Sequence, residues 1–128
     1  MRLWHENLLP FLPREQLLGQ HRECCALRGK GWGKKHATVD YVFTQDPACL
    51  VAYHFKVMQE MVNRGYQLDG AWLQPLYRGK KLGLDVEWVD LQKLAQCMCL
   101  KFPIFSEHNE TYMKECLDNL ERKGIKMY

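Results

Sequence analysis

One stretch of the sequence decides the fold: PREQLLGQHRECCALRG, residues 13–29. A proline suits the first turn of a helix, where its missing N–H costs nothing, and Gly29 suits the left-handed position that follows a helix. Five apolar side chains between these ends fall within one half of the helical wheel: Leu17, Leu18, Cys24, Cys25 and Leu27. This spacing predicts a helix over residues 13–28 that packs one face on a core.

Three later segments carry start and stop signals of the same kind. The second helix is predicted over residues 46–64, where an Asp-Pro pair begins it and a glycine follows it. The third is predicted over about residues 90–101 and the fourth over about residues 109–123. Only residues 41–44 and 86–89 are compatible with short strands. The second helix is expected to bury Leu50, Val51, Val57, Met58, Met61 and Val62.

Length and composition restrict the class of protein. The chain has 128 residues, 47% of them hydrophobic and 26% charged, which is an ordinary globular balance. No apolar run approaches the roughly 20 residues that span a bilayer, and no signal core follows the N-terminus. Six cysteines are not spaced like a disulfide framework. We therefore expect one all-α domain over residues 1–128, of about four helices with long loops, cytoplasmic, with reduced thiols and no membrane partner.

Positive charge is concentrated at the start of the chain. Residues 1–36 hold seven Lys and Arg against three acidic residues, whereas residues 37–128 hold eleven against twelve. A local basic face suggests an anionic partner, of which nucleic acid is the commonest, although a solvated surface without a partner has the same composition. The glycine-rich basic stretch at residues 29–36 is compatible with phosphate contacts or with a plain connector.

Glu23 is the carboxylate that this helix leaves without a local partner. It falls at the edge of the apolar face beside Gln20 and Leu27, whereas Arg22 points away. No basic residue lies three or four positions from it, so it pairs with a distant cation, faces solvent, or has a raised pKa. Taken alone, this pattern favours a surface glutamate paired with a distant Lys or Arg over a functional carboxylate.

Histidine and cysteine spacing gives a weaker signal. His21 and Cys25 are four residues apart and could share a metal, but no second pair at ligand spacing completes a zinc site. His54 falls in the apolar arc of the second helix, which predicts a hydrogen-bonded core histidine. We expect no metal centre. A small metal-binding protein using His21 and the cysteines would instead purify with stoichiometric metal.

Several short motifs together resemble the pyrimidine-dimer DNA glycosylase family, the phage endonuclease V type of repair enzyme. The motifs are MRL at residues 1–3, LLGQHRE at 17–23, KH at 35–36, NRGY at 63–66 and YRG at 77–79. The resemblance covers roughly residues 1–80 and is closest to a bacterial branch that opens with Met-Arg-Leu-Trp-His.

The resemblance implies an all-α enzyme that acts on damaged double-stranded DNA, at pyrimidine dimers or abasic sites. In such bifunctional glycosylases and abasic-site lyases, the N-terminal α-amine attacks C1′, releases the base and forms a Schiff base, and β-elimination then cuts the strand. Carried over to this chain, the nucleophile is the amine of Met1 and the acid–base carboxylate is Glu23. The large Arg2 is expected to prevent removal of Met1. No small-molecule cofactor is implied.

The proposed chemistry agrees with ordinary acidities. An α-amine has a pKa of about 7.7–8.0, so a useful fraction is neutral and nucleophilic near neutral pH. The predicted DNA contacts are Arg2, Gln20, His21, Arg22, Arg28, Lys34, Lys35 and His36.

Three departures from the phage enzyme keep a second hypothesis open. Ala26 stands where that enzyme has an arginine, and His21 stands where it has a tyrosine. Its C-terminal aromatic and basic segment is replaced by an amphipathic helix. Lyase chemistry is therefore better supported than dimer specificity, and a non-catalytic nucleic-acid-binding or interaction module with the same fold is the alternative.

Overall fold

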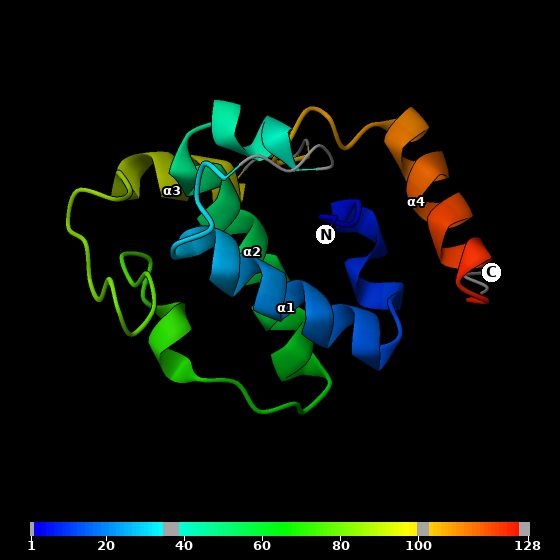
Figure 1. Cartoon of the computed structure of the whole chain (residues 1–128), viewed down its shortest axis with the longest axis horizontal. Helices are drawn as coiled ribbons and strands as arrows, with labels where there is room; N and C mark the ends of the chain where they lie inside the picture. The colour runs from blue at the N-terminus through cyan, green and yellow to red at the C-terminus, as the bar shows by residue number, and fades with distance from the viewer. Residues whose placement is uncertain (1, 35–38, 100–102, 126–128) are drawn as a thin grey trace.

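Helices account for all the regular elements of the described chain (Figure 1). This computed structural model describes residues 2–34, 39–99 and 103–125. In chain order, the elements are η1 (Glu6–Phe11), α1 (Arg14–Arg28), η2 (Asp40–Thr44), α2 (Pro47–Asn63), η3 (Gly70–Leu73), α3 (Leu91–Cys99) and α4 (Glu110–Arg122), where η denotes a 3₁₀ helix. No strand forms among these residues, which confirms the predicted all-α class.

The α-helices begin and end close to the residues that the local signals indicate. The Asp46 side chain accepts a hydrogen bond from Ala48 N at 2.9 Å and caps α2, and Gly65 ends it with a φ of 78°. Gly29 is different, because its φ is −91° and not left-handed. Glycine gives room there, since a Cβ would lie only 3.1 Å from the Arg78 carbonyl oxygen.

Neither possible strand is formed. Residues 41–44 lie in η2, where Val42 N donates to the Val39 carbonyl and Gln45 N to the Val42 carbonyl. Residues 86–89 form a turn and an extended connection. Both segments have β-favouring side chains, but a strand needs a partner for its ladder hydrogen bonds. In the described chain, the short bonds within η2 satisfy the backbone instead.

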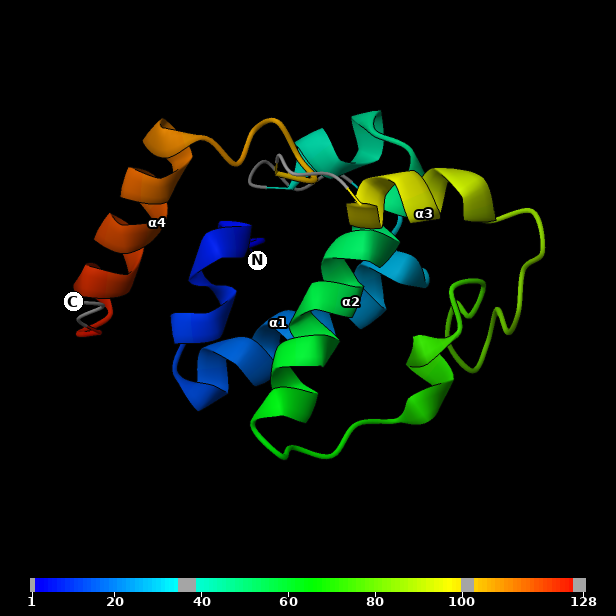
Figure 2. The ribbon, with the colours of Figure 1, turned by 180° about the vertical axis from the view of Figure 1, so that it is seen from behind.

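The core lies between α1 and α2 and includes the N-terminal segment. Figures 1 and 2 show this segment, with η1, between α4 on one side and α1 and α2 on the other. Leu3 and Trp4 are buried there. The predicted buried face of α2 is correct except at Val62, which is 54% exposed, and Leu18 of α1 is only partly buried. Residues 2–4 are therefore fixed against three helices.

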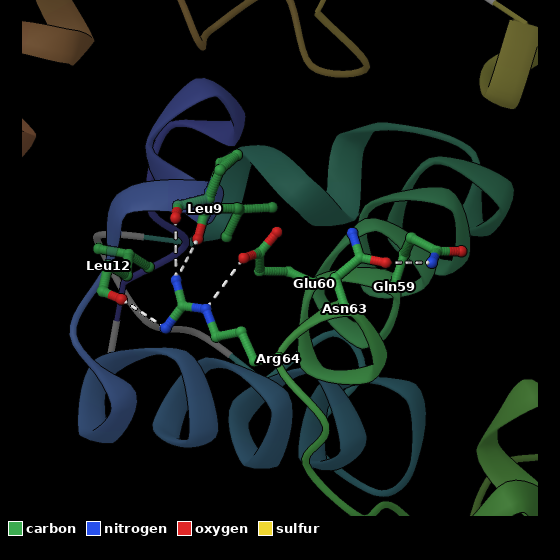
Figure 3. A network of polar contacts seen from close by, with 7 residues as sticks. Leu9, Leu12, Gln59, Glu60, Asn63 and Arg64 are labelled. Carbon is green, nitrogen blue, oxygen red and sulfur yellow. Dashed lines mark hydrogen bonds and ion pairs between the residues drawn. The ribbon is translucent and has the colours of Figure 1, made fainter.

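Arg64 ties the end of η1 to the end of α2 (Figure 3). Its Nε donates to Glu60 at 2.9 Å, and its two terminal nitrogens donate to the carbonyls of Leu12 at 2.7 Å and Pro10 at 3.0 Å. This arginine belongs to the NRGY motif, which thus has a structural role. No helix in the described parts of the chain is long and apolar enough to cross a membrane.

Candidate active site

Gln20 joins the N-terminal segment to α1. Its amide oxygen accepts from the backbone N–H of Trp4 at 2.6 Å and lies 2.9 Å from the Tyr53 hydroxyl. Its amide nitrogen donates to the Arg2 carbonyl and to Glu23 Oε2, each at 3.0 Å. These contacts use both amide hydrogens and the amide oxygen, and the side chain is buried. This burial argues against the expected DNA contact at Gln20, whose side chain holds the Arg2 backbone and the Glu23 carboxylate together.

Two tyrosines hold the same segment from the other sides. The Tyr53 hydroxyl of α2 donates to the Trp4 carbonyl at 2.6 Å, and the Tyr112 hydroxyl of α4 donates to the Leu3 carbonyl at 2.5 Å. Burial raises the pKa of Tyr112 to about 12, so the hydroxyl stays protonated and remains a donor. The backbone of residues 2–4 is therefore fixed beside Glu23.

The Glu23 carboxylate lies at the edge of this network. It is half-buried, and burial raises its pKa above the ordinary value. Hydrogen bonds from the Arg2 backbone N–H and the Gln20 amide partly oppose that rise, because they stabilise the charged form. No salt bridge to Glu23 forms within the described residues. The carboxylate is thus poised to hold or release a proton nearer to neutral pH than a solvated glutamate.

Lys123 is a member of this region that sequence reasoning missed. It follows α4, and its Nζ lies 5.4 Å from the centre of the Trp4 ring. Its positive charge also lowers the pKa of Glu23, in opposition to burial. A lysine at a helix end has no local signal for such a role, and only the packing of α4 against the N-terminal segment brings it here.

Arg28 is buried completely and does not face solvent as a DNA contact would. Its guanidinium donates to the carbonyls of Trp72 at 2.9 Å, Gln74 at 2.8 Å and Tyr77 at 3.0 Å. Burial lowers its pKa to about 10, which still leaves it charged at neutral pH. The expected phosphate contact at Arg28 is therefore wrong, and its role is to hold the loop after η3 onto α1.

A cluster of His21, Cys25 and His54 lies on the same side of α1 as Arg28. The His21 Nδ1 and His54 Nε2 atoms lie 2.8 Å apart, and Cys25 Sγ lies 3.8 Å from His21 Nε2. Among the described residues they are the group with metal-ligand atoms that all lie within 4.8 Å of one another. His54 is fully buried and hydrogen-bonded, which confirms the predicted core histidine.

The chemistry of Arg28 makes the cluster a poor metal site. Its Nη1 lies 3.0 Å from His54 Nδ1, and because a guanidinium only donates, Nδ1 accepts and the proton resides on Nε2. To bind a metal through Nε2, His54 would need a free lone pair on Nε2 and a hydrogen-bond acceptor for a proton on Nδ1. Burial lowers the pKa of both His54 and His21. We therefore interpret the group as a neutral hydrogen-bonded chain that orients half-buried His21.

The remaining predicted contacts differ in exposure. Arg22 and Lys34 are exposed, whereas Arg2 is half-buried, with its guanidinium carbon 5.7 Å from the centre of the Tyr112 ring. The predicted residues that lie outside the described part of the chain are Met1, Lys35 and His36.

Comparison with protein families adds the decisive observation. The family model described as pyrimidine dimer DNA glycosylase matches residues 1–74, more than half of the chain. The protein belongs to this family. The family places the protein with DNA-repair proteins of the pyrimidine dimer glycosylase type, whose substrate class is DNA.

The matched part of the chain contains Gln20 and Glu23, whereas α3, α4 and Lys123 lie beyond it. Comparisons with the curated proteins and with the solved structures give no match.

Proposed function

We propose that the protein is a bifunctional DNA glycosylase and abasic-site lyase that uses the α-amine of Met1 and the carboxylate of Glu23. One observation carries the proposal: a single Gln20 amide group donates to both the Arg2 carbonyl and the Glu23 carboxylate. Arg2 is bonded directly to Met1. The contact therefore supports a site in which the terminal amine and the carboxylate serve the same reaction.

The first step of the proposed reaction is displacement at C1′ of the damaged nucleotide. The amine lone pair forms the N–C1′ bond while the glycosidic bond breaks, and the released base takes up a proton. The sugar ring then opens as O4′ gains a proton, which leaves an iminium between the amine nitrogen and C1′. At an abasic site, the same amine condenses with the C1′ aldehyde and water leaves.

Strand cleavage follows by β-elimination. A proton leaves C2′, and the 3′ phosphate departs with the electron pair of its C3′–O bond. Hydrolysis of the remaining imine restores the amine. The Glu23 carboxylate stabilises the positive charge that develops at C1′ and relays these protons, a task for which a raised pKa is suited.

The proposed DNA contacts are cations near the start of the chain. Arg22 and Lys34 are exposed, and Arg2 lies beside the carboxylate. With Lys35 and His36, these side chains would bind phosphates, which supply affinity without reading the lesion. Pyrimidine dimers and abasic sites are both proposed as substrates, and His21 remains a proposed contact at the edge of the same helix.

Reduction with borohydride tests the proposal. With duplexes that contain an abasic site or a pyrimidine dimer, reduction of the iminium should give a stable protein–DNA product on a denaturing gel. Protein acetylated at its N-terminus is the matched control and should give none while still binding DNA. If the unmodified protein binds both duplexes but neither is trapped or cut, the non-catalytic DNA-binding alternative holds instead.

A further inference from the structure

A pocket of 370 Å³ lies where the end of α1 meets the loop after η3. Its floor includes Trp72, Ala26 and backbone of the glycine-rich stretch, and its lining also includes Lys30, Lys80 and Lys81. We call it the lysine pocket. No carboxylate lines it among the described residues. Its floor is apolar and its charged side chains are all cations.

The loop that carries two of these lysines is fixed to α1. Arg78 Nε donates to the Arg28 carbonyl at 2.9 Å, and the Arg78 backbone N–H donates to the Gly83 carbonyl at 2.8 Å. The second bond closes the turn at residues 79–83, which contains Lys80 and Lys81. The turn is therefore held beside the end of α1, and its cations are positioned before any ligand arrives.

The positive charges of the three lysines are available to bind an anionic ligand. Lys30, Lys80 and Lys81 are exposed, and no salt bridge to them forms within the described residues. Asp85, the carboxylate at the base of the turn, lies 3.3 Å from Arg78 Nη1 and is paired there. Three neighbouring cations without carboxylate partners favour an anionic ligand with more than one charge.

The lysine pocket lies along α1 from the candidate active site. Arg22 and Ala26 are four residues apart on α1 and both exposed, so they lie on one side of the helix, and exposed Lys30 follows its end. From Glu23, α1 continues for five residues to Arg28, roughly 7.5 Å at 1.5 Å per residue, and Lys30 lies two residues beyond the helix end, so we take the separation as roughly 10 Å. One DNA strand rises 3.4 Å per nucleotide, so this distance corresponds to roughly three nucleotides.

We propose that the lysine pocket is a second DNA contact, which binds backbone phosphates about three nucleotides from the reacting nucleotide. The lysines bind the phosphates, and the apolar floor with Trp72 accommodates the deoxyribose between them. The position of the reacting nucleotide rests on the proposed function. The turn at residues 79–83 lies beyond the family match, so this contact extends the DNA interface past the matched region.

Charge-matched variants test this contact. Lys80→Gln/Lys81→Gln removes two exposed cations from the lysine pocket, and Lys93→Gln/Lys114→Gln removes two from elsewhere. Binding is measured over a range of salt concentrations, on a 25-base-pair duplex with an uncleavable abasic-site analogue. We expect the first pair to weaken binding about tenfold at low salt and to reduce the salt slope by about 0.9 for each lost phosphate contact. The second pair should bind as wild type does.

Shortened duplexes locate the contact. When the duplex ends one base pair from the lesion on the pocket side, wild type and Lys80→Gln/Lys81→Gln should bind equally. Equal affinity and equal salt slope on the full duplex would overturn the lysine pocket, whatever the borohydride result. Conversely, a wild-type protein that is never trapped, but whose binding still depends on these lysines, would contradict the proposed chemistry and support the pocket.

Discussion

The two sides of α1 bury similar polar residues and use them differently. On one side, Gln20 links the backbone of Arg2 to the Glu23 carboxylate, whose pKa burial raises. On the other side, Arg28 binds backbone carbonyls and fixes the tautomer of a neutral histidine. The first side combines a proton-exchanging group with the start of the chain. The second holds a loop in place, so two polar sets on one helix have different roles, the first proposed as catalytic and the second structural.

The largest expected effect is on the first side. Glu23→Gln keeps the size and hydrogen-bonding capacity of the side chain but cannot exchange protons or carry negative charge. Strand cleavage should fall by about 10²- to 10⁴-fold, the range for a general acid–base group. Single-turnover cleavage of an abasic duplex measures it, with DNA affinity as the control. Unchanged cleavage would remove Glu23 from the mechanism.

The next effect is on stability and belongs to the second side. Arg28→Ala leaves several buried carbonyls and His54 without their donor, and we expect a loss of about 3 kcal/mol or more in the free energy of unfolding. Arg22→Ala, an exposed neighbour, should change stability by less than about 0.5 kcal/mol. Urea denaturation compares the two. If the Arg28→Ala protein were fully stable but bound DNA more weakly, Arg28 would instead be a DNA contact.

The pH dependence of cleavage tests the role of Glu23 as the acid–base carboxylate. The rate should rise through the pKa of the amine, near 7.7–8.0, as the neutral nucleophile forms. It should also fall in acid as Glu23 is protonated, at a pH above the ordinary glutamate pKa because burial raises that value. A single-turnover profile tests both limbs, and Glu23→Gln should lack the acid limb. An acid limb retained in that variant would assign it to another group.

The smallest expected effect is on DNA affinity and leaves the rate of cleavage unchanged. Arg22→Ala removes one exposed cation next to Glu23 and should lower the salt slope of DNA binding by about 0.9. The rate of cleavage at saturating protein should stay the same. Fluorescence anisotropy at several salt concentrations gives the slope. A slope equal to that of wild type would show that Arg22 does not contact a phosphate.

Local signals predicted the helices well and the roles of their polar residues less well. Helix ends depend on caps, prolines and glycines within a few residues, so α1, α2 and α4 begin and end within one residue of their predicted ends. The burial of Gln20 and Arg28 depends on backbone groups of Trp4 and of the loop after η3, far along the chain. A helical wheel shows which apolar side chains share a face of one helix. It cannot show hydrogen bonds to groups far along the chain.

The candidate site was predictable only where the motif itself supplied it. Glu23 was identifiable because no basic residue lies three or four positions from it, and its environment does raise its pKa. Lys123 and the lysine pocket arise from packing between segments with no periodic relationship. The sequence pattern of α1 therefore indicated the carboxylate but not the groups that surround it.

The residue to which trapped DNA is attached tests the central claim most directly. Two amines are relevant: the terminal amine of Met1, and Lys123, whose charge acts on Glu23. After borohydride reduction and nuclease treatment, cleavage after glutamate releases residues 1–6 as one peptide for mass spectrometry. We predict that the sugar remnant is on the α-amine of Met1 within that peptide. A remnant on Lys123, with an unmodified N-terminal peptide, would contradict it.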